Sequence, residues 1–167
     1  ADISPVRTVL TERFNNLKVG FGAKIASLSE AGEFDPAKIM DYLEEFMAEQ
    51  DFSDLAEQYL IPKETFHEAF TGLLKASISG IPEADEIIKK AIETLSISIT
   101  EVIMKSEILT KVGGLTAYLS SSFANAIHVD QDALISAFKL NFTEDELARV
   151  VTAMFTKTET SLAANLS

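Results

Sequence analysis

The stretch from Pro82 to Lys105 constrains the fold of this chain more than any other. Its apolar residues recur at steps of three and four, which keeps them on one side of an α-helix. They are Ala84, Ile88, Ala91, Leu95, Ile99 and Val102. Ile87, Ile92 and Ile103 flank this stripe, so more than one neighbouring helix can pack against it. The pattern predicts the central helix of a helical bundle.

Residues 95–100 also fit a second pattern. From Leu95 to Thr100 apolar and polar residues alternate, and several are β-branched, as in a half-buried strand. The length of the apolar stripe and its continuation upstream favour the helix. We therefore expect a helix, and a β-sheet through positions 95–103 would overturn the helical bundle.

Helix starts precede two further amphipathic segments. Ser4 and Asp35 are each followed by proline, which suits a capping residue and the first helical turn. Gly32 is a plausible stop for the first helix. Gly20 and Gly22 inside that helix predict a bend or the close approach of another backbone. The predicted inward residues are Val6, Leu10, Phe14, Leu17, Phe21, Ile25 and Leu28 in the first helix, and Ile39, Met40, Leu43, Phe46 and Met47 in the second.

Two more helices are predicted before the central one. A short helix covers Ser53 to Leu60, and another begins at Ile61 and Pro62 and ends at Gly80. Because the central helix starts two residues later, these two neighbours should be antiparallel. The inward residues of the helix after Pro62 are Phe66, Phe70, Leu73, Leu74 and Ile78.

The final third of the chain is also predicted to be helical. After an interruption at Gly113 and Gly114, a helix carries Leu115, Tyr118, Leu119, Phe123 and Ile127. Asp130 can cap a short helix. The last helix begins at a capping box of Thr143 and Glu146, with Phe142 and Leu147 as a hydrophobic staple. The chain is thus predicted to be all-α, a single domain over residues 1–167 with six to eight helices and ends that equally suit the start of a linker.

Composition narrows the classes of function. The 167 residues can bury a stable core, and there are no cysteines to form disulfides. No apolar run is long enough to cross a bilayer, so no membrane span is expected. The formal net charge of −12 argues against nucleic acid and anionic membrane surfaces as partners. Because the sequence starts at Ala1, we expect a processed product or an excised fragment.

The sequence contains no pattern typical of an enzyme. A cysteine nucleophile is excluded, and neither a Gly-x-Ser-x-Gly turn nor a glycine-rich phosphate loop occurs. His67 is expected to be a partly exposed helix residue. His128, Asp130 and Asp132 could in principle ligate a metal, but a capped, solvated loop is the simpler interpretation. We therefore predict no catalytic, cofactor-binding or metal site.

The sequence favours neither haem nor calcium as a ligand. His67 and His128 are too far apart in sequence for the two faces of a globin-like pocket. The face of the second helix is crowded with carboxylates, but no EF-hand loop with its required glycine is present, and a solvated acidic face is the preferred interpretation. Its residues are Asp41, Glu44, Glu45 and Glu49, followed by Asp51, Asp54 and Glu57.

Two triplets match the N-glycosylation sequon: Asn141-Phe142-Thr143 and Asn165-Leu166-Ser167. They are compatible with secretion and do not establish it.

Three segments resemble a known family. They are Val6-Arg7-Thr8-Val9-Leu10, Phe66-His67-Glu68-Ala69-Phe70 followed by Leu73-Leu74, and Leu119-Ser120-Ser121-Ser122-Phe123-Ala124-Asn125-Ala126. Their sequences are similar to those of the helical repeat domains of spider silk proteins, the aciniform and aggregate-type spidroins. This chain departs from typical silk repeats, which are saturated with Ser, Ala and Gly, because it is rich in Glu, Ile and Lys. A charged glue protein fits better than a load-bearing fibre.

The resemblance implies a secreted, non-enzymatic structural protein. Its helical domains would stay soluble through like charge and associate with other copies when pH falls or salt rises. The competing expectation is a helical binding module that encloses an apolar small molecule or accepts a partner helix.

Overall fold

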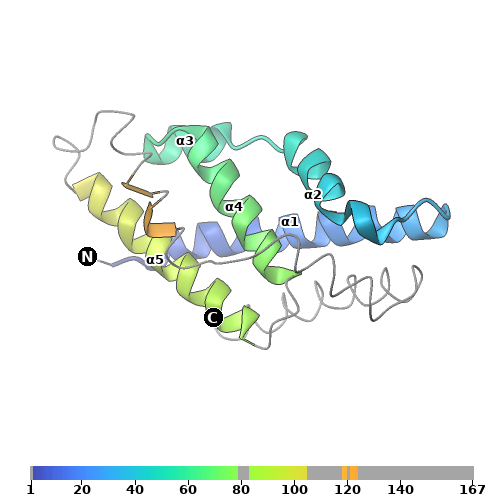
Figure 1. Ribbon diagram of the computed structural model, residues 1–167. Helices are drawn as coiled ribbons and strands as arrows, with labels where there is room; N and C mark the ends of the chain where they lie inside the picture. Colours follow the sequence, from blue (N-terminus) through green and yellow to red (C-terminus); the bar gives the residue numbers. More distant parts are fainter. Residues whose placement is uncertain (1, 79–82, 105–117, 120, 124–167) are drawn as a thin grey trace.

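The computed structural model describes residues 2–78, 83–104, 118–119 and 121–123 (Figure 1). These residues form α1 (Ser4–Glu30), the 3-10 turn η1 (Pro36–Lys38), α2 (Ile39–Ala48), α3 (Ser53–Tyr59), α4 (Lys63–Ser77) and α5 (Ala84–Met104). Residues 118–119 and 121–123 are also helical, and no strand occurs in the described ranges. The expected all-α fold is confirmed.

The segment with the alternating pattern lies inside α5, so the strand alternative is wrong. Ser96 and Ser98 are buried there beside Leu95 and Ile99. The Ser96 hydroxyl donates to the carbonyl oxygen of Ile92 at 2.6 Å. A hydroxyl that bonds to the preceding helical turn can be buried without losing a hydrogen bond, so polar residues are tolerated on this face. The expected inward stripe is buried from Ile88 to Val102.

The helices pack around the long α1. In Figure 1, α1 runs across the middle of the view, α4 and α5 cross it, and α2 and α3 lie above it. α1 contacts α2, α4 and α5, and α4 contacts α2, α3 and α5. α4 and α5 run in opposite directions, as the short connection between them predicts. α5 thus packs against two helices, as expected of a broad apolar stripe.

The described helices share one hydrophobic core. Most of the inward residues predicted from the sequence are buried, among them Phe14, Phe70 and Ile99, each with 0% exposure. Leu28 and Phe46 are only partly buried against this core. Ile103, expected to widen the stripe of α5, is 49% exposed and lies on the solvent side. The helical periodicity therefore located the core, and the edges of the stripe did not all become buried.

The first helix starts one residue earlier than the sequence predicts. Ser4 was expected to cap the helix, but it is already the first helical residue. The backbone N–H of Ser4 donates instead to the Asp2 carboxylate at 3.0 Å. Asp2 therefore supplies the capping acceptor, because its carboxylate reaches the free N–H groups at the helix start.

The expected stop and restart around Gly32 are confirmed. Gly32 has a φ of +71°, its N–H bonds to the Ser29 carbonyl, and the N–H of Glu33 bonds to the Leu28 carbonyl. These two bonds are a Schellman motif, which requires a left-handed residue that glycine adopts without strain. Asp35 then accepts a hydrogen bond from the Ala37 N–H at 3.0 Å. This cap opens η1, which leads directly into α2.

Several expectations concern residues outside the described ranges. They include the interruption at Gly113 and Gly114, the capping box of Thr143 and Glu146, and both sequons. Of the helix expected around Phe123, the described part is helical, Leu119 is buried, and the Phe123 ring lies against Gly72 of α4. No described helix combines the length and the apolarity needed to cross a membrane.

Candidate functional site

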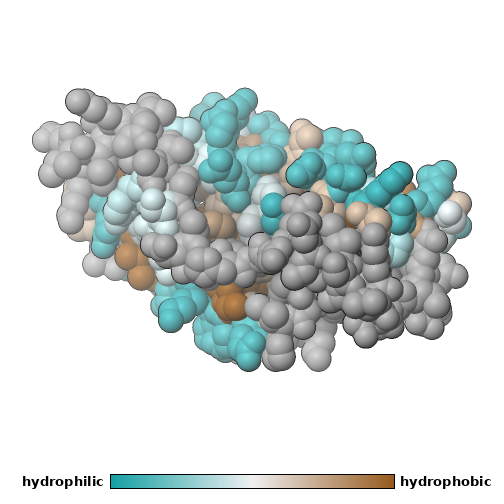
Figure 2. Space-filling model, in the orientation of Figure 1, coloured by the Kyte–Doolittle hydropathy of each residue, from teal (hydrophilic) through white to brown (hydrophobic). Residues whose placement is uncertain are grey.

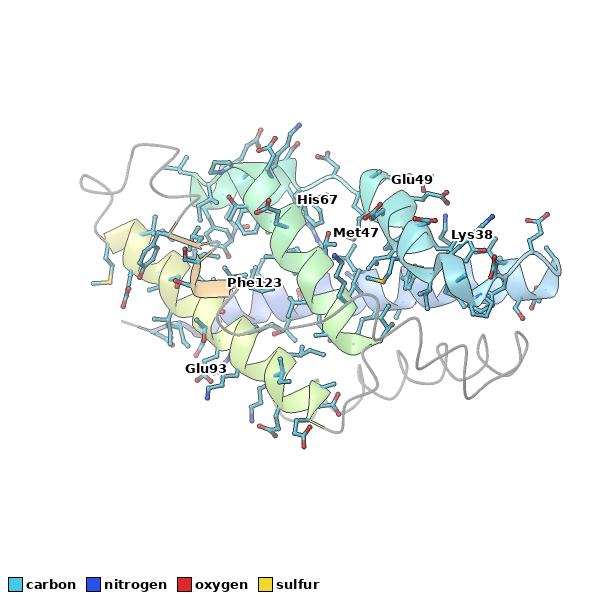
Figure 3. All side chains as sticks on the ribbon, in the orientation of Figure 1. Lys38, Met47, Glu49, His67, Glu93 and Phe123 are labelled. Carbon is cyan, nitrogen blue, oxygen red and sulfur yellow. The ribbon has the colours of Figure 1, made fainter. Side chains whose placement is uncertain are left out.

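His67 lies in the first half of α4, where α4 meets the end of α2 (Figure 3). Its Nε2 atom is 3.2 Å from the carbonyl oxygen of Met47. Because a carbonyl only accepts hydrogen bonds, Nε2 must be the protonated nitrogen and the donor. The side chain is half-buried, as expected for a partly exposed helix residue. The bond thereby ties α4 to the C-terminal turn of α2.

Phe52 connects His67 to the core. The Phe52 ring is buried and stacks on Phe70, with ring centres 5.4 Å apart and an angle of 15° between the planes. The His67 ring meets it edge-on, with ring centres 6.0 Å apart. The Arg13 guanidinium carbon lies 5.7 Å from the ring centre. Phe52 is therefore held by three neighbours, which fixes the position of the chain between α2 and α3.

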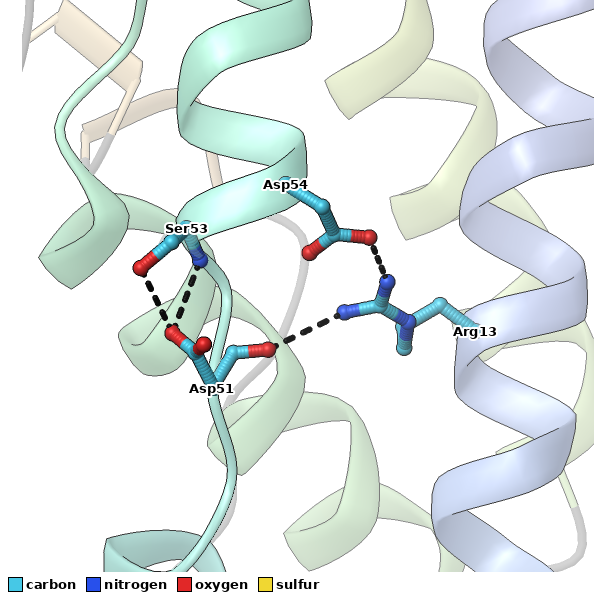
Figure 4. A network of polar contacts seen from close by, with 4 residues as sticks. All are labelled: Arg13, Asp51, Ser53 and Asp54. Atoms are coloured by element: carbon cyan, nitrogen blue, oxygen red, sulfur yellow. Dashed lines mark hydrogen bonds and ion pairs between the residues drawn. The ribbon is translucent and has the colours of Figure 1, made fainter.

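Arg13 of α1 also holds the start of α3 through polar contacts (Figure 4). Its guanidinium forms an ion pair with the Asp54 carboxylate and is 3.5 Å from the carbonyl oxygen of Asp51. The Asp51 carboxylate in turn accepts hydrogen bonds from the hydroxyl and the backbone N–H of Ser53, at 2.6 and 3.0 Å. This network anchors the α2–α3 connection to α1.

Both carboxyl groups of this network have lowered pKa values. The Ser53 hydroxyl and then the Ser53 N–H lower the pKa of Asp51, because hydrogen bonds to a carboxylate favour its charged form. Desolvation raises the pKa of Asp54, but the hydrogen bond from Arg13 and its positive charge together outweigh that effect. Both groups therefore stay ionised below the ordinary carboxyl pKa.

An open pocket of about 190 Å³ lies beside His67. It forms where the α2–α3 connection meets the first turns of α4. Its lining consists of Gln50, Asp51, Phe52, Lys63, Glu64 and His67. Four of these six side chains are charged or can become charged, so the lining favours a polar ligand over the apolar one that the sequence suggested as an alternative.

The acidic residues of α2 are exposed, as the sequence predicted. Asp41, Glu44, Glu45 and Glu49 are all on the solvent side, and Figure 3 shows Glu49 at the end of α2. Glu45 is 3.4 Å from the Lys24 ammonium. In the part of the chain that the structure describes, no three His, Asp or Glu side chains are placed to hold a metal ion.

No protein-family model, curated protein or solved structure matches this chain. The candidate site therefore rests on its geometry.

The structure brings together residues that the sequence interpretation did not group. Lys63, Glu64 and Gln50 were not singled out, and Phe52 was not expected to connect three elements. The spacing of Glu64 and His67, three apart on one helix, was the available signal. His128, Asp130 and Asp132 lie outside the described residues.

Lys18 is a second residue that the apolar pattern missed. Its side chain is fully buried on α1, and Nζ lies 4.8 Å from the centre of the Phe14 ring. Thr11, Asn15 and Lys18 follow one another at steps of four and three, so they share a face of α1. Thr11 is also buried. Polar side chains that follow one another beside an apolar stripe are normally expected to face solvent. The sequence gives no sign that those of Thr11 and Lys18 are buried.

Proposed function

We propose that this chain is a non-enzymatic structural domain of a secreted silk-like or glue-like protein. It stays soluble through its negative charge and associates with other copies of itself when pH falls or salt rises. The resemblance of three segments to spidroin helical repeat domains supports this proposal. The observation that carries it is the acidic, exposed face of α2.

The carboxylates on this face repel one another. Asp41 with Glu45, and Glu45 with Glu49, are like charges four residues apart on a helix, and each such pair costs about 0.2–0.5 kcal/mol. Asp41, Glu44 and Glu49 form no ion pair with another described residue. Figure 2 shows hydrophilic surface along the edge where α2 and α3 lie. Added salt or protonation would remove this repulsion, and a second copy could then approach.

The chain as a whole also carries an excess of negative charge. The formal net charge is −12, and two ion pairs join described side chains, Arg13 with Asp54 and Lys24 with Glu45. Repulsion between such molecules is long-ranged at low ionic strength, because the Debye length is about 30 Å at 0.01 M salt and about 3 Å at 1 M. Association should therefore respond strongly to salt.

Sedimentation velocity combined with circular dichroism tests the proposal. We expect monomers at pH 7 in low salt, and larger species on adding NaCl or lowering the pH toward the ordinary carboxyl pKa values of about 4. The helical signal should persist through the first association step. A chain that stays monomeric across both titrations would rule the proposal out. Tandem copies of this domain in the full gene product are expected as well.

A charge-matched pair of variants locates the effect. The variant D41N/E44Q/E45Q/E49Q removes four charges from α2. The control E12Q/E57Q/E83Q/E93Q removes four exposed charges: one from α1, one from α3, one from the residue just before α5 and one from the middle of α5. Both variants have the same net charge, so a difference between them reports the position of the charges. Because the proposed repulsion lies on α2, the α2 variant should associate at lower salt than the control. Equal behaviour would assign the response to net charge alone.

The second candidate is a binding module for a partner helix. Exposed apolar side chains on the second half of α5 favour it: Ile97 is 41% exposed, Ile103 49% and Met104 67%. Apolar side chains at helical spacing are the usual anchors for a partner helix. Native mass spectrometry discriminates the two candidates. A co-purifying partner or ligand favours the module, and concentration-dependent oligomers without one favour the structural domain.

A further inference from the structure

One face of α5 is exposed to solvent along most of the helix. Its residues follow one another at steps of three and four, so they lie on one side of the helix. We call them the outer stripe of α5: Glu86, Lys90, Glu93, Ile97, Glu101 and Met104, all of them exposed. The first half of this stripe is charged. The second half combines large apolar side chains with carboxylates.

The apolar part of the outer stripe is enlarged by Tyr118. Ile97 lies four residues before Glu101 and Met104 lies three residues after it, so both are helical neighbours of Glu101. Tyr118 is 38% exposed, and its hydroxyl donates to the Glu101 carboxylate at 3.1 Å. Three large exposed side chains therefore surround one carboxylate. Clustering of this kind, with polar groups at its edge, is typical of a surface that contacts another protein.

Glu101 is held in position by Tyr118. The Tyr118 hydroxyl donates to Oε2, and Oε1 accepts no hydrogen bond from another described residue. The hydrogen bond to Glu101 and desolvation raise the pKa of Tyr118, because both favour the neutral phenol. Tyr118 therefore remains a donor. The carboxylate keeps one oxygen for a partner, and its side chain has less freedom to lose on binding.

The charge of the outer stripe selects a class of partner. Its three carboxylates outnumber its one ammonium group, and none of the three forms an ion pair with another described residue. A helix whose apolar side chains pack on Ile97 and Met104 has its flanking positions near Glu93 and Glu101. Lys or Arg at those positions would be attracted to the carboxylates, whereas Asp or Glu would be repelled.

Other occupants fit this surface less well. A second copy would bring carboxylates together, since Glu93 faces Glu101 in an antiparallel contact centred on Ile97 and faces itself in a parallel one. A small apolar molecule needs a concave site to bury most of its surface, whereas Ile97 and Met104 project from a helix. An anionic membrane surface would be repelled by the same carboxylates.

We propose that the outer stripe of α5, together with Tyr118, binds a basic amphipathic helix. Apolar side chains of the partner, spaced like Ile97 and Met104, contact these two residues. Lys or Arg side chains beside them pair with Glu93 and Glu101. The proposal rests on the second candidate function and names the chemistry of its partner. It does not depend on the self-association of the first candidate, which is measured without a partner.

A nuclear magnetic resonance titration of the full chain at pH 7 in low salt tests this surface. The probe is a synthetic helix of three heptads with Leu at the a and d positions and Lys at the e and g positions, and the control peptide has Glu in place of each Lys. We expect saturable amide shifts centred on Ile97, Glu101, Met104 and Tyr118, with a Kd of about 10 to 100 μM for the Lys peptide. The Glu peptide should bind at least about tenfold more weakly.

A first pair of variants tests the apolar contacts. I97S/M104S should weaken binding of the Lys peptide at least about tenfold, because it removes both apolar anchors. The matched control V19S/L60S also replaces two exposed apolar side chains, one on α1 and one at the end of α3. It should leave the Kd within about twofold of wild type.

A second pair of variants separates local charge from net charge. E93Q/E101Q should weaken binding of the Lys peptide about threefold to fivefold, because it removes two carboxylates from the contact. E12Q/E57Q removes two exposed carboxylates from α1 and α3 and has the same net charge. It should weaken binding by less than about twofold, since those charges are screened from the peptide.

The possible failures can be told apart. An unchanged Kd in I97S/M104S, with a native circular dichroism spectrum, would overturn the site, and so would an equal effect of E12Q/E57Q and E93Q/E101Q. If the Glu peptide binds as tightly as the Lys peptide at these amides, the helix-binding function stands and the basic partner is wrong. If neither peptide gives saturable shifts there, both are wrong. Salt-driven association of the chain without peptide is a separate measurement and decides the first candidate function.

Discussion

Gly20 of α1 makes room for the ring of Phe46 of α2: a Cβ atom added to Gly20 would lie 2.9 Å from Cζ of Phe46. The sequence predicted a bend or the close approach of a backbone at this glycine, and the structure shows that a side chain approaches instead. Phe46 packs beside Phe21 with ring centres 5.7 Å apart. The contact fixes how closely α2 lies against α1.

Replacing Gly20 by alanine tests this contact. Alanine favours a helix by about 1 kcal/mol over glycine, but here the Phe46 ring must move to accommodate the new methyl group. We expect G20A to be no more stable than wild type in urea unfolding. In an F46A background the same change should stabilise by about 1 kcal/mol, so the double-mutant cycle should show coupling of that size. Stabilisation by G20A in the wild-type background would show that the Phe46 ring does not oppose a Cβ atom at this position.

The two isoleucines at 97 and 99 test the helical assignment of α5. In a strand both would face the same side, whereas in a helix they lie on different faces. Ile99 has 0% exposure and Ile97 41%. We expect I99A to lose about 2–4 kcal/mol of unfolding free energy, and I97A less than about 1 kcal/mol. Equal losses, measured by urea unfolding, would contradict the assignment.

Leu60 provides a prediction about backbone strain. It ends α3 with φ 56° and ψ 43°, the left-handed conformation, and its side chain is 84% exposed. A leucine is strained there by about 1 kcal/mol, and little burial compensates. L60G should therefore raise the unfolding free energy by about 0.5–1 kcal/mol. L60A, which keeps a Cβ atom, should show no such gain, and a larger gain for L60A than for L60G would refute the explanation.

The ion pair of Arg13 with Asp54 predicts a pH dependence. The pKa of Asp54 is lowered from 3.8 in the folded chain, so its stabilising effect is complete above that value and is lost as the pH falls through the folded pKa. D54N should be less stable than wild type by about 0.5 kcal/mol at pH 6, since most of the Asp54 side chain is exposed. The difference should shrink in 0.5 M NaCl and below pH 3.8.

E57Q is the control for this measurement. Glu57 is an exposed carboxylate on the same helix and forms no ion pair with another described residue. The unfolding free energy of E57Q should differ little from that of wild type at pH 6. A D54N difference that persists at acidic pH would show that the lost contact is not the charge interaction.

The sequence by itself determined the elements. Helical periodicity placed the stripe of α5, and local chemistry placed the stop at Gly32 and the cap at Asp35. These signals are local, since a cap or an apolar stripe is defined by residues within a few turns of one helix. The same reasoning misplaced the start of α1, because Asp2 and Ser4 compete for one role and both are good caps.

Only the tertiary structure decided which helices meet and what their meeting produces. The pocket beside His67 combines the end of α2, the following connection and the start of α4. Its residues are ordinary in sequence, and none of them forms a motif. Burial of Lys18 likewise depends on its surroundings and not on α1 itself. Contacts between distant segments follow from the packing of whole helices, and that packing leaves no local signature in the chain.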